Sequence, residues 1–242
     1  MSEINESSLY WPFLEGNRFA TLTRVLGGLA LLNIAVALWM ALFYAPMEQK
    51  LRYSQRIFYF HVPSAWIGFL AFFVVFLASI MYLWKRKRQW DVLALSSAEI
   101  GVIFTTLVLL TGPLWAKYAW GVYWVWDARL TSALVLWLIY VSYLMLRAYA
   151  GEGPRQANWA AVLGIVGAFD IPIILVSVEW WRTQHPELIV IKGTGLPDPR
   201  MRITLMVALL SFTWLYFFLL SNRVRLERAR DEVARIKERL GR

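Results

Sequence analysis

The chain has 242 residues, of which 59% are hydrophobic and only 17% are charged, and its mean hydropathy is +0.50. This apolar excess excludes an ordinary soluble enzyme and indicates a membrane protein. The lack of cysteine excludes disulfides, thiolate metal sites and thioether attachment of a prosthetic group. The formal net charge is +9, but Lys and Arg cluster beside apolar runs, as topology signals do. We therefore expect membrane lipid, and no nucleic acid, as the partner of these charges.

Six apolar runs are long enough to cross a bilayer, which takes roughly 20 predominantly apolar residues. They are residues 25–44, 62–84, 100–115, 130–146, 159–178 and 203–221. Asp170 and Pro172 should make the fifth run the least regular. The sequence thus predicts an all-α polytopic membrane protein, a bundle of six transmembrane helices. It forms one domain over residues 1–222, followed by a basic amphipathic cytoplasmic helix over 223–242 that lies on anionic lipid or against a partner.

The basic residues predict the orientation of these spans. Of the 25 Lys and Arg, 16 lie on the side of the two termini and 9 on the opposite side, so both termini should be cytoplasmic. Residues 1–17 lack the pattern of a secretory signal, and we expect them to be retained. The connections 45–60 and 179–202, together with the aromatic connection between the third and fourth spans, then face outward.

The first outward connection leads to His61, one of only two histidines in the chain. Pro63 is well placed for the first turn of the second span, so His61 should stand at the entry to that helix. Two roles are open for His61. A lone histidine at a membrane interface is commonly hydrogen-bonded to a carbonyl, and the alternative is that it binds a metal.

The second outward connection is unusually rich in aromatic residues. Residues 115–131 contain Trp115, Trp120, Trp124 and Trp126, four of the chain's 14 tryptophans. Such a flat, rigid surface suits a large planar ligand, whereas a membrane aromatic belt explains only one or two tryptophans per helix end. If this stretch is helical, Trp120 and Trp124 stack on one face, and Gly121 lets a flat ligand approach the backbone.

The third outward connection carries the second histidine, His185. Pro186 follows it and favours an extended turn. Two imidazoles are what one six-coordinate haem iron requires. Haem propionates favour arginine or lysine, and the nearest outward bases are Arg56, Lys117, Arg129 and Arg182, for which lipid headgroup contact is the alternative. Asp127 could cap the fourth span by accepting from the amides near Arg129 and Leu130. Asp170 is an acid within a span, and the sequence does not indicate its role.

One segment resembles the tryptophan-rich signature of haem-handling membrane proteins. It reads Trp120-Gly121-Val122-Tyr123-Trp124-Val125-Trp126-Asp127-Ala128-Arg129-Leu130-Thr131. Three features resemble the cytochrome c maturation family CcmC, the haem exporter protein C family. They are Phe-His-Val-Pro-Ser-Ala-Trp at 60–66, Ser-Val-Glu-Trp-Trp at 177–181 with His185 after it, and the six-span length. Tyr123 stands where many relatives have tryptophan, and a phenol ring still stacks.

The resemblance implies a protein of the bacterial inner membrane that presents haem at the periplasmic face and transfers it to the haem chaperone CcmE. Its other implied partners are the ABC subunits CcmA and CcmB and the small subunit CcmD. His61 and His185 map onto the axial ligands of a non-covalent haem b. The aromatic segment maps onto the haem platform, for which we select Trp115, Trp120, Tyr123, Trp124, Trp126, Asp127, Arg129 and Arg56.

Three functions remain open from the sequence. The first is haem binding and transfer without catalytic turnover, in which case the protein is not an enzyme. A b-type cytochrome oxidoreductase is the second, although two histidines supply a single haem at one surface and no relay across the core of about 30 Å. The third is a haem permease, for which the irregularity at Asp170 and Pro172 is the one supporting feature.

Overall fold

The computed structural model describes residues 16–151, 153–181 and 196–241. Most residues in these ranges are helical and none lies in a strand, and six helical stretches are long and apolar enough to cross a membrane. The all-α prediction with six spans is therefore confirmed. The helices are α1 (Gly16–Trp39), the π-helix η3 (Met40–Tyr44), α2 (Gln55–Lys85), α3 (Arg88–Trp120), α4 (Ala128–Tyr149), α5 (Pro154–Ala168), α6 (Asp170–Trp180) and α8 (Pro199–Arg239).

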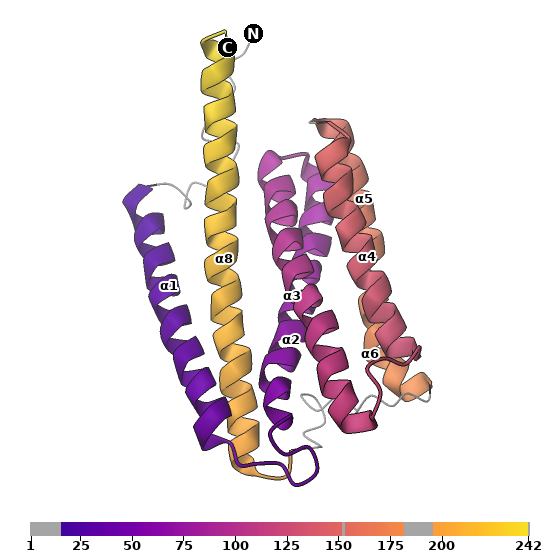
Figure 1. The fold of residues 1–242 in the computed structure, drawn as a ribbon. Helices are drawn as coiled ribbons and strands as arrows, with labels where there is room; N and C mark the ends of the chain where they lie inside the picture. Colours follow the sequence, from indigo (N-terminus) through magenta and orange to yellow (C-terminus); the bar gives the residue numbers. More distant parts are fainter. Residues whose placement is uncertain (1–15, 152, 182–195, 242) are drawn as a thin grey trace.

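The helices form three neighbouring groups. Figure 1 shows α1 beside α8, α2 and α3 in the middle, and α4 with α5 and α6 on the far side. The described chain begins and ends at the same end of the bundle, which we call the terminal end. The opposite end, which we call the aromatic end, is where α2 begins, α3 ends, α4 begins and α6 ends.

Small residues let the central helices approach closely. A Cβ on Gly68 of α2 would lie 2.7 Å from Thr105 Cγ2, and one on Gly101 of α3 would lie 2.4 Å from the Phe72 ring. Such contacts are typical of helix pairs in membranes, where van der Waals packing replaces the hydrophobic effect. Phe72 also stacks on Tyr140 of α4, with ring centroids 3.6 Å apart. These contacts connect the central pair to α4.

At the terminal end, a network of ion pairs joins α3, α4 and α8. Asp91 is buried and accepts from Arg147 through both oxygens, at 2.6 and 2.8 Å, and from Arg88 at 2.5 Å. Arg88 also donates to Asp231 of α8 at 3.0 Å. Arg223 of α8 donates to Glu99 of α3. The apolar packing of the spans thus ends in a layer of paired charges.

The last helix is far longer than a membrane span. At about 1.5 Å per residue, the 41 residues of α8 extend about 60 Å, twice the apolar core of a bilayer. Residues 223–239 continue the span without a break, and Figure 1 shows the end of α8 rising above the other described helices. The basic tail expected as a helix is therefore one piece with the sixth span.

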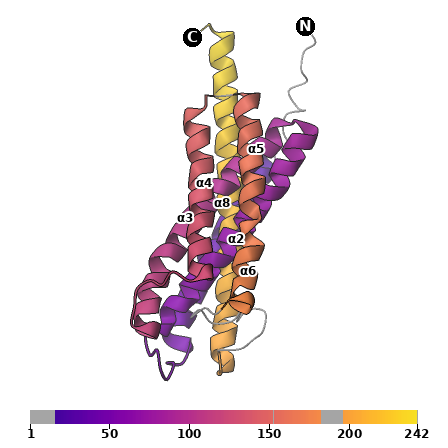
Figure 2. The same cartoon turned by 90° about the vertical axis from the view of Figure 1, so that its right-hand side faces the viewer.

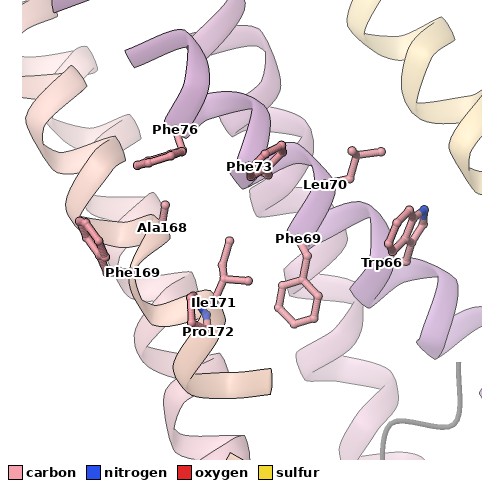
Figure 3. A pocket seen from close by; sticks show the side chains of 9 residues that line it. All are labelled: Trp66, Phe69, Leu70, Phe73, Phe76, Ala168, Phe169, Ile171 and Pro172. Carbon is pink, nitrogen blue, oxygen red and sulfur yellow. The ribbon is translucent and has the colours of Figure 1, made fainter. Parts of the chain in front are cut away.

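The fifth span is interrupted, as Asp170 and Pro172 led us to expect. α5 ends at Ala168 and α6 begins at Asp170, and Figure 2 shows the two following one another along the bundle. Next to this break lies an apolar cavity of about 400 Å³ between α2 and the α5–α6 junction. Figure 3 shows Phe69 and Phe73 of α2 on one side, with Phe169 and Ile171 on the other.

Candidate functional site

The described residues selected from the sequence gather at the aromatic end. Arg56 and His61 lie in the first two turns of α2, and Trp115 and Trp120 lie in the last two turns of α3. The remaining candidates lie in residues 121–127 or in the first turn of α4. Figure 1 shows these three segments meeting at that end. His185 lies outside the described residues, so its predicted role as a ligand stays a prediction.

His61 differs in one respect from the sequence-based expectation. α2 begins at Gln55, so Pro63 is inside the helix and His61 is in its second turn, not just before it. The expectation placed the helix start at Val62, because Pro63 suits a first helical turn, but the helix begins at Gln55 and includes the aromatic residues 58–60. The half-buried imidazole therefore has its orientation set by α2 and by the facing helix α3.

The contact with α3 is direct. His61 Nδ1 lies 2.9 Å from Thr111 Oγ1, and Thr111 Oγ1 donates to the Leu107 carbonyl at 2.7 Å. A Cβ on Gly112 would come within 3.1 Å of His61 Cε1, so glycine leaves room for the ring. Neither Thr111 nor Gly112 was selected from the sequence. The only signal was a small, polar interruption of the third apolar run, which has no distinctive chemistry by itself.

The aromatic segment is not one helix, and the predicted helical stacking of Trp120 and Trp124 is wrong. α3 ends at Trp120 because Gly121 adopts a left-handed conformation with φ of +81°, and residues 121–127 are irregular. A Cβ on Gly121 would meet open space, so this glycine is required by the turn and not by a tight contact with the protein.

The indoles pair in a different way from the predicted stack. Trp115 and Trp120 make an edge-to-face contact with centroids 5.5 Å apart, and Trp124 and Trp126 make another at 5.6 Å. Trp126 is among the most exposed aromatic side chains, whereas Trp124 is half-buried. The two rings of each pair are therefore almost perpendicular, and the segment presents separate ring faces and edges, not the single flat surface expected from the sequence.

The basic candidates have different roles in the structure. Lys117 donates to the Gly121 carbonyl at 2.9 Å and lies over the Tyr123 ring at 5.3 Å, so it closes the turn after α3. Arg56 lies over Tyr53, 5.0 Å from the ring centroid. Arg129 is half-buried and interacts electrostatically with both His61 and Asp127. Arg182 lies outside the described residues.

Asp127 is the cap predicted for the fourth span. Its Oδ1 accepts from the Leu130 amide at 2.8 Å and so begins α4. This cap fixes the start of α4, and with it the position of Arg129 two residues later. The capping signal was local and readable from the sequence, which is why this prediction is confirmed.

Buried polar atoms without a partner are concentrated in this segment. Such atoms are uncommon in proteins because each costs the desolvation free energy of an unmade hydrogen bond. Four of those found among the described residues belong to residues 115–129: Trp115 Nε1, Trp124 Nε1, Asp127 Oδ2 and Arg129 Nη1. Three of the four are donors, and together they offer two indole N–H groups and a guanidinium to an anionic ligand. This donor set fits the propionates of haem, and the imidazole and indole rings fit its iron and its faces.

The end of α6 adds further aromatic surface. α6 ends at Trp180 at the aromatic end, and Trp180 and Trp181 are exposed and make an edge-to-face contact at 6.1 Å. The chain therefore leaves α6 at the end where His61 lies, five residues before His185.

Known proteins resemble nearly the whole chain. The model of the family described as CcmC, haem exporter protein C, matches residues 12–239. The haem exporter protein C of Bradyrhizobium diazoefficiens is 40% identical over 204 residues, which cover 82% of this chain and 77% of the relative. The haem exporter protein C of Haemophilus influenzae is 34% identical over 221 residues, 90% and 86% of the two chains. A ccmC-like mitochondrial protein of cytochrome c biosynthesis from Marchantia polymorpha is 34% identical over 203 residues, 83% and 86%.

Proposed function

The chain belongs to the haem exporter protein C family, and we propose that it holds haem b non-covalently at the aromatic end and passes it to a haem chaperone. Haem handling for cytochrome c maturation is the general function of the family. His61 and His185 are the proposed axial ligands. The observation that carries the proposal is the half-buried His61, held against α3 at the same end of the bundle as the buried donors of residues 115–129 that lack partners.

Each part of the site has a distinct task in this proposal. His61 binds the iron from a rigid helix, while His185 binds it from the connection after α6. The unpaired Nη1 of Arg129 meets a propionate, which replaces a missing hydrogen bond with a charged one. The exposed Trp126 and Tyr123 leave one edge of the porphyrin reachable. Transfer needs such an edge, because a cargo enclosed within the bundle could not be handed over.

The partners follow from the same reasoning. The chaperone CcmE approaches the exposed aromatic rings, and CcmA, CcmB and CcmD complete the assembly in the bacterial inner membrane. In this arrangement the aromatic end faces the periplasm and the terminal end faces the cytoplasm. Reporter fusions in residues 45–54 and 121–127 test the topology, and both should report an external location. A cytoplasmic report from either connection would contradict the proposal.

Replacing the histidines tests the ligand assignment. The full chain is purified in detergent, and the haem content and absorption spectrum of His61→Ala and His185→Ala are compared with the unaltered protein. Each variant should lose the low-spin bis-imidazole spectrum, and added imidazole should restore it at the vacated position. Unchanged haem content and an unchanged low-spin spectrum in both variants would rule the assignment out. Co-purification with and without the chaperone, followed by haem absorbance, tests the transfer.

The broken fifth span favours a second candidate, a haem permease. Discontinuous helices are common at the substrate sites of transporters, and Phe169 and Ile171, the neighbours of Asp170 in the sequence, line the apolar cavity at the α5–α6 junction. Asp170 Oδ2 is buried without a hydrogen-bond partner. Haem uptake by liposomes that contain this chain alone would support transport. Uptake that needs further subunits would leave binding and transfer as the function of this chain.

A further inference from the structure

We propose that Thr111 is a positioning residue that holds His61 in the Nδ1–H tautomer, so that Nε2 is the atom presented to the haem iron. The inference depends on the proposed function for its purpose, but the tautomer itself can be measured without haem. A neutral imidazole carries one proton on either nitrogen, and only the other nitrogen can bind a metal. The partner of Nδ1 therefore decides which atom is available.

The two hydrogen bonds at Thr111 determine the direction of the contact. A threonine hydroxyl has one hydrogen, and Thr111 Oγ1 lies 2.7 Å from the Leu107 carbonyl, which can only accept. The hydroxyl hydrogen is therefore directed along α3 to that carbonyl. Toward His61, 2.9 Å away, the oxygen has only lone pairs to offer. Both contacts are satisfied together only if Nδ1 is the donor.

The same arrangement occurs at two other threonines in the described part of the chain, each with an unambiguous donor. Thr106 Oγ1 donates to the Val102 carbonyl at 2.7 Å and accepts from Trp137 Nε1 at 2.8 Å. Thr213 Oγ1 donates to the Leu209 carbonyl at 2.8 Å and accepts from Trp66 Nε1 at 3.0 Å. An indole N–H can only donate. A threonine bonded back to its own helix thus acts as an acceptor for a ring N–H at all three positions.

Gly112 supports the same orientation from the adjacent position. A Cβ there would lie 3.1 Å from His61 Cε1 and 3.8 Å from Nδ1, so the Nδ1–Cε1 edge of the ring faces α3. Ligating histidines commonly donate their second ring N–H to a protein acceptor, which fixes the ring and raises the basicity of the ligand. Removing that acceptor typically weakens metal binding by about 10- to 100-fold.

The first test reads the tautomer directly. The full chain with His185→Ala, labelled with ¹⁵N-histidine and kept free of haem, contains His61 as its only histidine, so its imidazole signals need no further assignment. We expect a protonated Nδ1 and an unprotonated Nε2. Thr111→Val keeps the shape but removes the acceptor, and it should shift the population toward the Nε2–H tautomer. Thr111→Ser keeps the hydroxyl and should restore the original pattern.

Thr106→Val is the matched control, because it removes an equivalent acceptor on the same helix without touching His61. It should leave the His61 tautomer unchanged. An Nε2–H tautomer in the protein with Thr111 intact would overturn the proposal, whether or not the valine variant folds. An unchanged tautomer in Thr111→Val would overturn it as well.

The second test measures haem affinity in the chain with both histidines present. Thr111→Val should weaken haem binding about 10- to 100-fold, and Thr111→Ser and Thr106→Val should stay close to the unaltered protein. The two proposals can fail separately. A low-spin haem that survives His61→Ala refutes the ligand assignment. Loss of that spectrum in His61→Ala, with unaltered affinity in Thr111→Val, refutes only the role of Thr111.

Discussion

The two ends of the bundle handle their polar groups in opposite ways. At the terminal end, the buried Asp91 is shared by Arg147 and Arg88, and Arg223 is paired with Glu99. At the aromatic end, Arg129 Nη1, Asp127 Oδ2 and two indole N–H groups are buried without a hydrogen-bond partner among the described residues. A closed network holds helices together, whereas unpaired donors are available to a ligand. The difference separates the end that maintains the bundle from the end at which we propose that haem binds.

Breaking the closed network should have the largest effect. Arg147→Ala leaves the carboxylate of Asp91, which is 3% exposed, without its main partner. Removing one member of a buried ion pair typically costs about 3–5 kcal/mol. The free energy of unfolding in detergent should fall by about that amount, while the remaining folded protein keeps its haem spectrum. Loss of haem with unchanged stability would contradict the division between the two ends.

Removing Arg129 should lower the affinity for haem and leave the stability of the helix bundle almost unchanged. A hydrogen bond to a charged group contributes about 1.5–3 kcal/mol, so Arg129→Ala should weaken haem binding by about 10- to 150-fold. The thermal unfolding temperature of the haem-free protein should change little, because the guanidinium has an unmet hydrogen bond there. Arg155→Ala at the terminal end is the control, and haem titration should show no change. Equal haem affinity in both variants would remove Arg129 from the site.

A pair of exposed tryptophans allows a matched comparison of the two ends. Trp126 is 76% exposed at the aromatic end, and Trp84 is 75% exposed near the terminal end of α2. An aromatic contact contributes about 0.5–1.5 kcal/mol, so Trp126→Ala should reduce haem affinity or transfer to the chaperone by about 2- to 12-fold. Trp84→Ala should leave both unchanged. The prediction fails if the two variants lose haem to the same extent.

The smallest effect concerns the cap of α8. Asp198 accepts from the Arg200 amide at 2.8 Å, and its hydrogen bonds with Arg200 lower the pKa of Asp198 below its ordinary value of 3.8. A lowered carboxyl pKa stabilises the fold above the unfolded pKa, and this contribution is lost as pH falls through the folded pKa. Asp198→Asn should therefore show slightly lower thermal stability than the parent at pH 7. The difference should vanish in strong acid. A difference that persists there would show that charge is not its cause.

The sequence predicted those features that depend on neighbouring residues. The six apolar runs, the interruption at Asp170 and Pro172, and the Asp127 cap were all readable because each depends on local chemistry. The start of α2 was missed because Pro63, which suits a first helical turn, lies inside the helix. The course of the aromatic segment was missed because Gly121 ends α3 in a left-handed conformation.

The contact of His61 with Thr111 shows why the site was harder to predict than the fold. The two residues are 50 positions apart, and only the packing of α2 against α3 brings them together. A threonine in an apolar span usually bonds to its own helix, which gives no sign of a second partner. The same applies to Arg147 and Asp91, which are 56 positions apart. Side-chain chemistry identified the candidates, but interhelical geometry determined which of them meet.

The length of α8 limits what can approach the terminal end. From Asp231, its last described ion-paired contact with α3, the helix continues for eight residues to Arg239, or about 12 Å. A flat protein surface could not lie directly against this end of the bundle, because the rod would hold it at a distance. Any subunit that covers the α2–α3 and α4–α5 turns must therefore have a recess for α8 or fit beside it.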